Sequence, residues 1–259
     1  MPRKARELSP TDFYHIMMRG INKERIFEKK QNKEFLVYLL KNDQEDFDIE
    51  ICAFCIMDNH AHLIVKGNLN DISEFIKKIN IKFAMSYNKS LERVGHVFQD
   101  RYRSENIYND NHLMQAISYV HNNPIKAGLV KNISDYKWSS YLEYFSKRDS
   151  IVSQNMKSLV LDVVGSKKSL QESHKDSQFI LFIDTEDDIE KTKQDIFDKI
   201  IKDFCEENCI IDASQLRIDP EKMENLIKKL LEQKAFSHRE IAGLLEVNRN
   251  LVHSLNNKE

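Results

Sequence analysis

The sequence predicts an α+β fold, in which a ferredoxin-like β-α-β-β-α-β domain is followed by a helical C-terminal region with a candidate helix-turn-helix. Three observations support this prediction. Strand-like and helix-like hydrophobic periods alternate over residues 12–122, and two of the strands are adjacent in sequence. The composition changes near residue 147, where Ser, Lys and Asp become frequent. Residues 187–257 then show helical spacing and no convincing strand alternation.

The first domain is expected to contain four strands and three helices. The strands are rich in aromatic, β-branched or alternating apolar residues and are expected at residues 12–19, 49–57, 60–66 and 97–107. The Asp58-Asn59 pair is a turn signal, so the second and third strands form a hairpin. Amphipathic helices are expected at residues 31–45, 71–88 and 111–122. Pro124 ends the last helix, because the residue before a proline disfavours the helical region, and the helices are expected on one face of the sheet.

The chain is predicted to have three parts. Residues 1–146 form the α+β domain, residues 147–186 a linker with one short helix around Met156 to Val164, and residues 187–259 a helical domain. Several aromatic residues close to the end of the first domain are expected to pack its last segment onto the core. They are Trp138, Tyr141, Tyr144 and Phe145.

The composition indicates a soluble, cytoplasmic protein. The 259 residues are 41% hydrophobic and 31% charged. No stretch approaches the roughly 18 consecutive apolar residues that a membrane helix needs. The cysteines are few for this length and are expected to be reduced thiols: Cys52, Cys55, Cys205 and Cys209. The net charge of −2 neither favours nor excludes nucleic acid, but residues 1–150 carry a small basic surplus, so any DNA contact is expected there first.

Residues 237–256 have the pattern of a helix-turn-helix. The run Ser237-His238-Arg239-Glu240 is a capping box that begins the first short helix. The second helix of such a motif enters the major groove of duplex DNA. Its reading residues would be Arg249, Asn250 and His253. The turn position that glycine often occupies is Glu246, and a helical hairpin that only packs is the alternative.

Two histidines at the start of the third predicted strand, His60 and His62, form the first candidate site. Successive side chains of a strand point to opposite faces, so this pair projects to one side and can share a metal ion. The rest of the strand is apolar, and histidines at the entrance to a buried strand need polar partners. Two exposed or hydrogen-bonded histidines are the alternative interpretation.

The last predicted helix of the first domain carries the second candidate site. Its apolar face consists of Leu113, Ala116, Ile117 and Val120. Tyr119 and His112 lie on one flank of that face, and Asn123 follows Tyr119 by one turn. Gln115 lies just beyond them. A hydroxyl, an amide and an imidazole therefore line one side of a helix that must dock on the sheet, although a boundary tyrosine with its hydroxyl in water is the alternative.

Four runs, in this order along the chain, resemble motifs of known transposases. The run from Met57 to Ile64 resembles the HUH motif of single-tyrosine transposases, and the run from Ile117 to Val130 resembles the nucleophile helix of REP-associated tyrosine transposases. Tyr14-His15 with Arg19-Gly20 resembles the first strand of that family, and Trp138-Ser139-Ser140-Tyr141 its closing segment. The resemblance covers residues 8–146, whereas the rest of the chain resembles the extra C-terminal part of some members only loosely.

The resemblance implies a catalytic domain that cleaves and rejoins single-stranded DNA through a 5′-phosphotyrosine link. It makes Tyr119 the nucleophile, His60 and His62 metal ligands, and Asn123 the third ligand. Two imidazoles and an amide oxygen suit Mg²⁺ or Mn²⁺ better than a closed zinc site. His112 is expected to support the chemistry, and either His112 or a metal-bound water is the candidate base.

The implied partner is single-stranded DNA with hairpins, because the reacting phosphate must be splayed from a duplex. Gln115, like His112, is expected to support the chemistry. Phosphate contacts are expected from basic residues of the first domain, namely Arg19, Arg101, Arg103 and Lys126. Duplex DNA would be bound by the C-terminal domain, no membrane is involved, and both a monomer and a homodimer are compatible with the sequence.

Two other functions are compatible with the sequence. One is a domesticated regulator that recognises hairpin DNA but performs no strand transfer, and the intact set His60, His62, Tyr119 and Asn123 counts against it. The other is a metal phosphodiesterase that uses water as nucleophile. It predicts turnover with no protein–DNA adduct.

Overall fold

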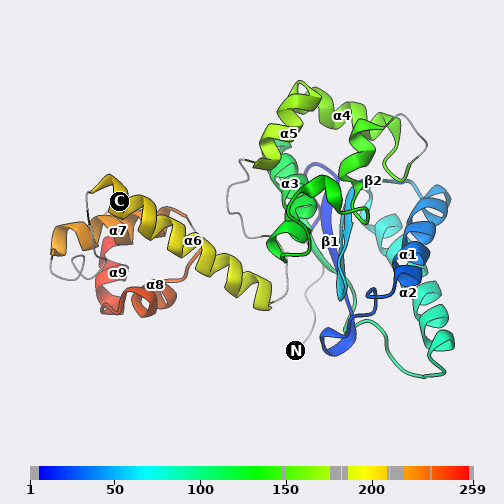
Figure 1. The fold of residues 1–259 in the computed structure, drawn as a ribbon, viewed down its shortest axis with the longest axis horizontal. Helices are drawn as coiled ribbons and strands as arrows, with labels where there is room; N and C mark the ends of the chain where they lie inside the picture. Colours follow the sequence, from blue (N-terminus) through cyan, green and yellow to red (C-terminus); the bar gives the residue numbers. More distant parts are fainter. Residues whose placement is uncertain are drawn as a thin grey trace. The chain divides into compact units, whose positions relative to one another are not determined.

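The computed structural model describes residues 6–146, 150–175, 182, 186–208, 210, 219–233 and 235–256. The chain divides into two compact units, Met1–Gln178 and Phe179–Glu259. Each unit has a hydrophobic core of its own, and Figure 1 shows the elements of both.

The first unit is built on a four-stranded antiparallel sheet with the strand order β2-β3-β1-β4. The strands are Phe13–Arg19 (β1), Ile49–Ile56 (β2), His60–Gly67 (β3) and Arg103–Asn106 (β4). The connection from β1 to β2 skips one position in the sheet, and β3 fills that position as the second arm of a hairpin. This order confirms the predicted ferredoxin-like fold.

Two helices cover one face of the sheet and a third covers the other (Figure 1). Helices α1 (Lys30–Asp43) and α2 (Leu69–Ser90) pack against each other and share a core with Ile16 of β1. Helix α3 (Asp110–Lys126) contacts β2 and β3 from the opposite side. The expectation that the helices share one face is therefore wrong for α3, which brings Tyr119 to the other face.

The fourth strand is shorter than the predicted span of residues 97–107, because β4 begins only at Arg103. The preceding segment follows the end of β1 without forming a regular strand, and the Gln99 amide donates to the Arg19 carbonyl at 2.9 Å. The chain then bends through the polar run that ends at Arg101, before β4 begins. Arg101 consequently lies on an exposed bend rather than in a strand.

Helix α3 continues through Pro124 to Lys126, beyond the predicted span of residues 111–122. A proline inside a helix removes one backbone hydrogen bond, which is why the sequence predicts an end here. Pro124 lies in the last turn, however, where few further helical bonds remain to be disrupted. The extension keeps Asn123 in a helical position one turn after Tyr119.

Much of the predicted linker, residues 147–186, forms two helices that pack on the first unit. Helix α4 (Gln154–Val164) contacts β2 and α3, and helix α5 (Lys167–Lys175) contacts α3. Polar contacts help to hold α5, since His121 Nδ1 and His174 Nε2 lie 2.9 Å apart in the core. A linker was expected because this segment is polar, and polarity alone does not reveal such buried pairs. The remaining parts of the predicted linker lie outside the described residues, at 147–149, 176–181 and 183–185.

The segment after α3 closes the first unit as predicted. Tyr141 and Tyr144 are buried, and the Tyr144 hydroxyl donates to the Cys52 carbonyl at 2.6 Å. Trp138 packs against the main core. Short 3₁₀ helices complete the unit at Ile21–Lys23, Gln44–Asp46, Ile133–Asp135 and Ser140–Phe145. Cys52, Cys55 and Cys205 are free thiols, whereas Cys209 lies outside the described residues.

The second unit is helical in its described residues. Its helices are Glu186–Glu207 (α6), Pro220–Glu232 (α7), His238–Leu245 (α8) and Arg249–Asn256 (α9). The predicted capping box at Ser237 is present, and Glu246 ends α8 in the left-handed region with φ 54°. DNA reading by α9 stays a prediction. None of the helices in the described segments is long and apolar enough to span a bilayer.

Candidate active site

Strands β1 and β3 place three histidines on the sheet face that α3 covers. In the antiparallel register, His62 lies opposite Met17 and His60 lies opposite Arg19. Residues directly opposite one another share a face, as do alternate residues of one strand, so His15 of β1 also faces α3. All three imidazoles are buried.

The Nδ1 atoms of His60 and His62 are both engaged within the protein. His60 Nδ1 lies 2.7 Å from the Asn59 side-chain oxygen. His62 Nδ1 lies 2.9 Å from His15 Nε2. Metal-binding histidines commonly use one ring nitrogen for the metal and the other for a hydrogen bond. The Nε2 atoms of His60 and His62 are therefore the nitrogens with ligand chemistry here.

The electrostatics around His62 favour a neutral imidazole. Burial, followed by the nearby His60, His15 and Lys126, holds the pKa of His62 well below its ordinary value. A metal ligand must be deprotonated, so a neutral imidazole is the form that binds. The site thus keeps His62 ready for a cation without first having to remove a proton.

Asn123 supplies the chemistry of a third ligand. Within the described residues, no group of three or more His, Cys, Asp or Glu side chains is arranged to hold a metal ion. The predicted set differs in that its third member is an amide. The Asn123 side chain is buried, and its Nδ2 donates to the Tyr119 carbonyl at 3.0 Å. Its amide oxygen is then the atom suited to a hard cation. Two imidazoles and one amide oxygen fit Mg²⁺ or Mn²⁺.

Tyr119 lies directly beside the histidines. Its side chain is 5% exposed, and its ring centroid is 5.8 Å from that of His62 and 5.9 Å from that of His15. The helix holds it there because its apolar residues bury against the sheet, while Asn109 caps the first turn by accepting from the His112 amide at 2.9 Å. The predicted nucleophile and the predicted metal ligands are therefore brought together.

Three of the predicted basic contacts lie near this cluster. Lys126 places its ammonium nitrogen 4.4 Å from the centre of the Tyr119 ring. Arg19 lies opposite His60 in the sheet, and Arg103 lies opposite Met17, so both start from the active-site face. A phosphate that approached the histidines would therefore meet the positive charges of these three side chains.

Other predicted site residues lie on α3 and α9. His112 stacks on Tyr108 with 5.7 Å between ring centroids and accepts from the Tyr108 amide at 3.3 Å. Seven residues of helix separate His112 from Tyr119, which is about 10 Å along the axis. Gln115 is half-buried one turn before Tyr119. Arg249 and Asn250 are exposed on α9 in the second unit.

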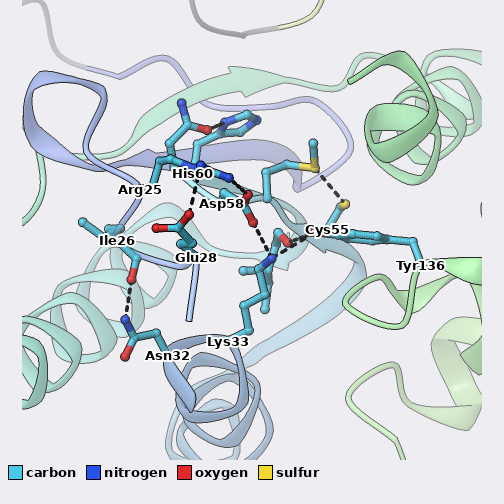
Figure 2. A network of polar contacts seen from close by, with 12 residues as sticks. Arg25, Ile26, Glu28, Asn32, Lys33, Cys55, Asp58, His60 and Tyr136 are labelled. Atoms are coloured by element: carbon cyan, nitrogen blue, oxygen red, sulfur yellow. Dashed lines mark hydrogen bonds and ion pairs between the residues drawn. The ribbon is translucent and has the colours of Figure 1, made fainter. Parts of the chain in front are cut away.

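A polar network fixes the turn that precedes His60 (Figure 2). Asp58 accepts from Lys33 Nζ at 2.6 Å and from the Arg25 guanidinium at 2.5 Å. Burial alone would raise the pKa of Asp58, but the hydrogen bonds from Lys33 and Arg25 lower it. The Tyr136 hydroxyl donates to the Ile56 carbonyl at 2.7 Å on the other side of the turn. These contacts tie the β2–β3 turn to α1 and to the closing segment, so the start of β3 is held from both sides.

Sequence reasoning missed the roles of His15 and Lys33. The available signal is that His15 is a polar residue among mostly apolar ones in its strand. It is four residues from Arg19, so the two side chains lie on the same face of the strand. Its partner depends on the β1–β3 register, which one sequence does not reveal. Lys33 is a buried lysine on a helix whose spacing only indicates an amphipathic surface.

Residues 12–123 match the family model described as IS200-like transposase. The resemblance to these transposases is confirmed. The IS200-like segment runs from the start of β1 to Asn123 and contains both histidines and Tyr119. Of the residues described at the candidate site, it therefore includes His15, His60, His62, Tyr119 and Asn123 but not Lys126.

One relative of known sequence and one solved structure are similar to parts of this chain. A Haemophilus influenzae protein, assigned by name to the REP-associated tyrosine transposases, is 27% identical over 112 residues, which cover 39% of this chain and 64% of that protein. This chain thus spans somewhat less than two thirds of its relative. A solved structure, described as a REP-associated tyrosine transposase bound to a REP hairpin, aligns with a TM-score of 0.48 and 19% identity, covering 59% of this chain and 91% of that one.

Proposed function

We propose that this chain is a metal-dependent transposase that cleaves and rejoins single-stranded DNA through a 5′-phosphotyrosine at Tyr119. The observation that carries the proposal is the contact of the Tyr119 ring with His62, 5.8 Å between centroids, on a face that also holds His60. A buried phenol beside two buried imidazoles matches the needs of metal-assisted phosphoryl transfer.

The metal would be held by Nε2 of His60, Nε2 of His62 and the amide oxygen of Asn123. When bound, Mg²⁺ or Mn²⁺ would polarise the scissile phosphate and offset charge in the transition state. The protein's own part is to present these donors in fixed orientation, which the hydrogen bonds of His60 and His62 support.

Tyr119 performs the transfer itself. Its phenol oxygen forms a bond to phosphorus while the bond from phosphorus to the 3′ oxygen breaks. The phenol loses its proton as it attacks, since a free tyrosine titrates near pH 10, and the departing 3′ oxygen takes up a proton. The phosphotyrosine keeps the energy of the phosphodiester, so a 3′ hydroxyl can reverse the step and join strands without ATP.

The proposed substrate is a hairpin-bearing single strand, as the resemblance to REP-associated tyrosine transposases implies. Arg19, Arg103 and Lys126 would bind its phosphates near the reacting bond. Arg101 would add a contact from its exposed bend, and α9 of the second unit would contact duplex DNA. The reaction would take place in the cytoplasm.

A covalent-trapping assay tests this function. The full-length protein is mixed with Mn²⁺ and labelled hairpin-bearing single strands, and the products are separated on a denaturing gel. We expect a protein–DNA band for the wild type that disappears with chelator and in Tyr119→Phe, because phenylalanine has no nucleophilic oxygen. The control is Tyr38→Phe, which removes a hydroxyl from an exposed tyrosine on α1 and should leave the band unchanged.

Two outcomes would contradict the proposal. Cleavage that persists in Tyr119→Phe would identify water as the nucleophile and the protein as a phosphodiesterase. Hairpin binding without cleavage by either protein would identify a hairpin-binding regulator.

A further inference from the structure

His15 is the buried neighbour of the proposed metal ligands and has no role in the function described so far. It lies in the middle of β1 and is fully buried, with its ring stacked on that of His62 at 5.1 Å between centroids. His15 Nε2 lies 2.9 Å from His62 Nδ1. On its other side, His15 Nδ1 lies 3.9 Å from the carboxylate of Glu105 on β4.

The two imidazoles allow one proton arrangement if His62 binds a metal. A neutral imidazole has one donor nitrogen and one acceptor nitrogen. His62 can ligate through Nε2 only if its proton is on Nδ1, and that N–H then donates to His15 Nε2. His15 must consequently carry its own proton on Nδ1, which is the nitrogen that faces the Glu105 carboxylate.

His15 could serve either as a third imidazole ligand or as a residue that positions His62, and the arrangement decides between these two roles. Its Nε2 is engaged by His62, and its Nδ1 is directed to Glu105, so His15 is not placed as a third imidazole ligand. A second imidazole in this position instead fixes the rotation of the His62 ring and its tautomer. The Glu105 carboxylate lies 3.9 Å from His15 Nδ1, so its negative charge favours a proton on that nitrogen.

We propose that His15 is a positioning residue that holds His62 in the Nδ1–H tautomer, while the negative charge of Glu105 favours the proton of His15 on Nδ1. The inference rests on the proposed function, because it assumes that His62 binds the metal through Nε2. It extends that function by a row of three side chains, which are Glu105 on β4, His15 on β1 and His62 on β3. The row leads to the proposed metal site.

The first test observes the tautomer of His62 directly in the wild-type protein without metal. Long-range nitrogen–proton correlation NMR, with the His62 signals assigned by comparison with His62→Gln, distinguishes the two neutral forms. We expect the proton of His62 on Nδ1. A proton on Nε2 would overturn the proposal, whether or not the protein cuts DNA.

The second test measures Mn²⁺ affinity by calorimetry for the full-length protein and two variants. His15→Phe keeps a flat ring but has no acceptor for His62 Nδ1–H, and it is expected to weaken Mn²⁺ binding by about 10- to 100-fold. His15→Gln places an amide oxygen near the position of Nε2 and should recover much of this loss. Ile16→Val is the matched control, since it alters the opposite face of the same strand.

The results separate failure of this inference from failure of the proposed function. Equal Mn²⁺ affinity of His15→Phe and the wild type, with a DNA adduct still formed, would overturn the role of His15 alone. A wild type that binds no Mn²⁺ and forms no adduct would overturn both. If His15→Phe does not fold, as judged by circular dichroism, His15→Asn replaces it: its shorter side chain does not reach His62, and the same loss of affinity is expected.

Discussion

At the scale of single residues, the candidate site combines a buried phenol and three buried imidazoles with the half-buried ammonium group of Lys126. Lys126 lies over the ring of Tyr119 at 4.4 Å, one turn beyond Asn123. A cation against the ring becomes more favourable as the phenol turns into a phenolate. Lys126 is thus placed to assist the nucleophile as well as to bind phosphate.

We predict that Lys126→Gln slows adduct formation by about tenfold, which corresponds to about 1.4 kcal/mol of lost transition-state stabilisation. The rate should also need a higher pH to reach its maximum, because the phenol loses a neighbouring positive charge. Single-turnover rates measured against pH check both effects. Lys131→Gln, an equal charge change at an exposed position, is the control, and identical pH profiles for the two variants would refute this role.

The sequence predicted side chains that the structure places close together, His62 and Tyr119 among them, but it did not predict their neighbours. His60, His62, Tyr119 and Asn123 stand within short runs whose spacing carries the chemistry, and the structure brings Tyr119 to His62. His15 could not be assigned from the sequence, because its contact with His62 joins residues that are 47 positions apart. The supporting role of His112 stays a prediction, since two helical turns separate it from Tyr119 and its ring stacks on Tyr108.

At the scale of elements, α3 is held from two sides. One side presents Tyr119 to the sheet, and the other buries His121 against His174 of α5. His121 Nε2 also lies 2.7 Å from the Ser140 hydroxyl. Helix α3 is therefore fixed by a histidine pair that must stay at least partly neutral.

We predict that the first unit loses stability as pH falls below about 6.5. Burial, followed by the charge of His174, holds the pKa of His121 well below the ordinary value of 6.5, and burial also lowers the pKa of His174. The unfolded chain then binds more protons than the folded chain, so stability present above pH 6.5 is lost on acidification, by up to about 1.4 kcal/mol per pH unit for each proton.

Urea unfolding at a series of pH values measures this effect, with His174→Gln as the comparison. The variant should be less stable at neutral pH but should depend less steeply on pH. An equal slope for both proteins would show that the histidine pair does not cause the acid sensitivity.

Element boundaries were predictable where a local pattern decides them. The hairpin turn at Asp58-Asn59 and the capping box at Ser237 are examples, and the structure confirms both. The end of α3 and the length of β4 were not predictable, because each depends on how the surrounding structure packs against it. Pro124 is tolerated in a last turn, and residues 97–102 follow β1 without completing a strand.

At the scale of the whole molecule, the chain consists of two units with separate cores. All residues proposed for catalysis lie in Met1–Gln178. The composition change near residue 147 predicted an earlier boundary, since the polar helices α4 and α5 resemble a linker in sequence. Their attachment to α3 extends the first unit to residue 178.

We predict that a fragment of residues 1–178 unfolds cooperatively and forms the DNA adduct at a rate close to that of the full chain. The second unit should add affinity for duplex DNA, so the fragment should lose duplex binding while it keeps hairpin binding. Thermal unfolding and the trapping assay check the first claim, and titration with duplex DNA checks the second. A folded but inactive fragment would show that the second unit takes part in catalysis.

The most direct test of the central claim is to identify the amino acid that carries the DNA. The trapped adduct would be digested with protease and nuclease, and the nucleotide-bearing peptide sequenced by mass spectrometry. The account predicts a single modified peptide, with a 5′-linked nucleotide on the Tyr119 oxygen. A nucleotide on another residue, or cleaved DNA with no attached peptide, would contradict it.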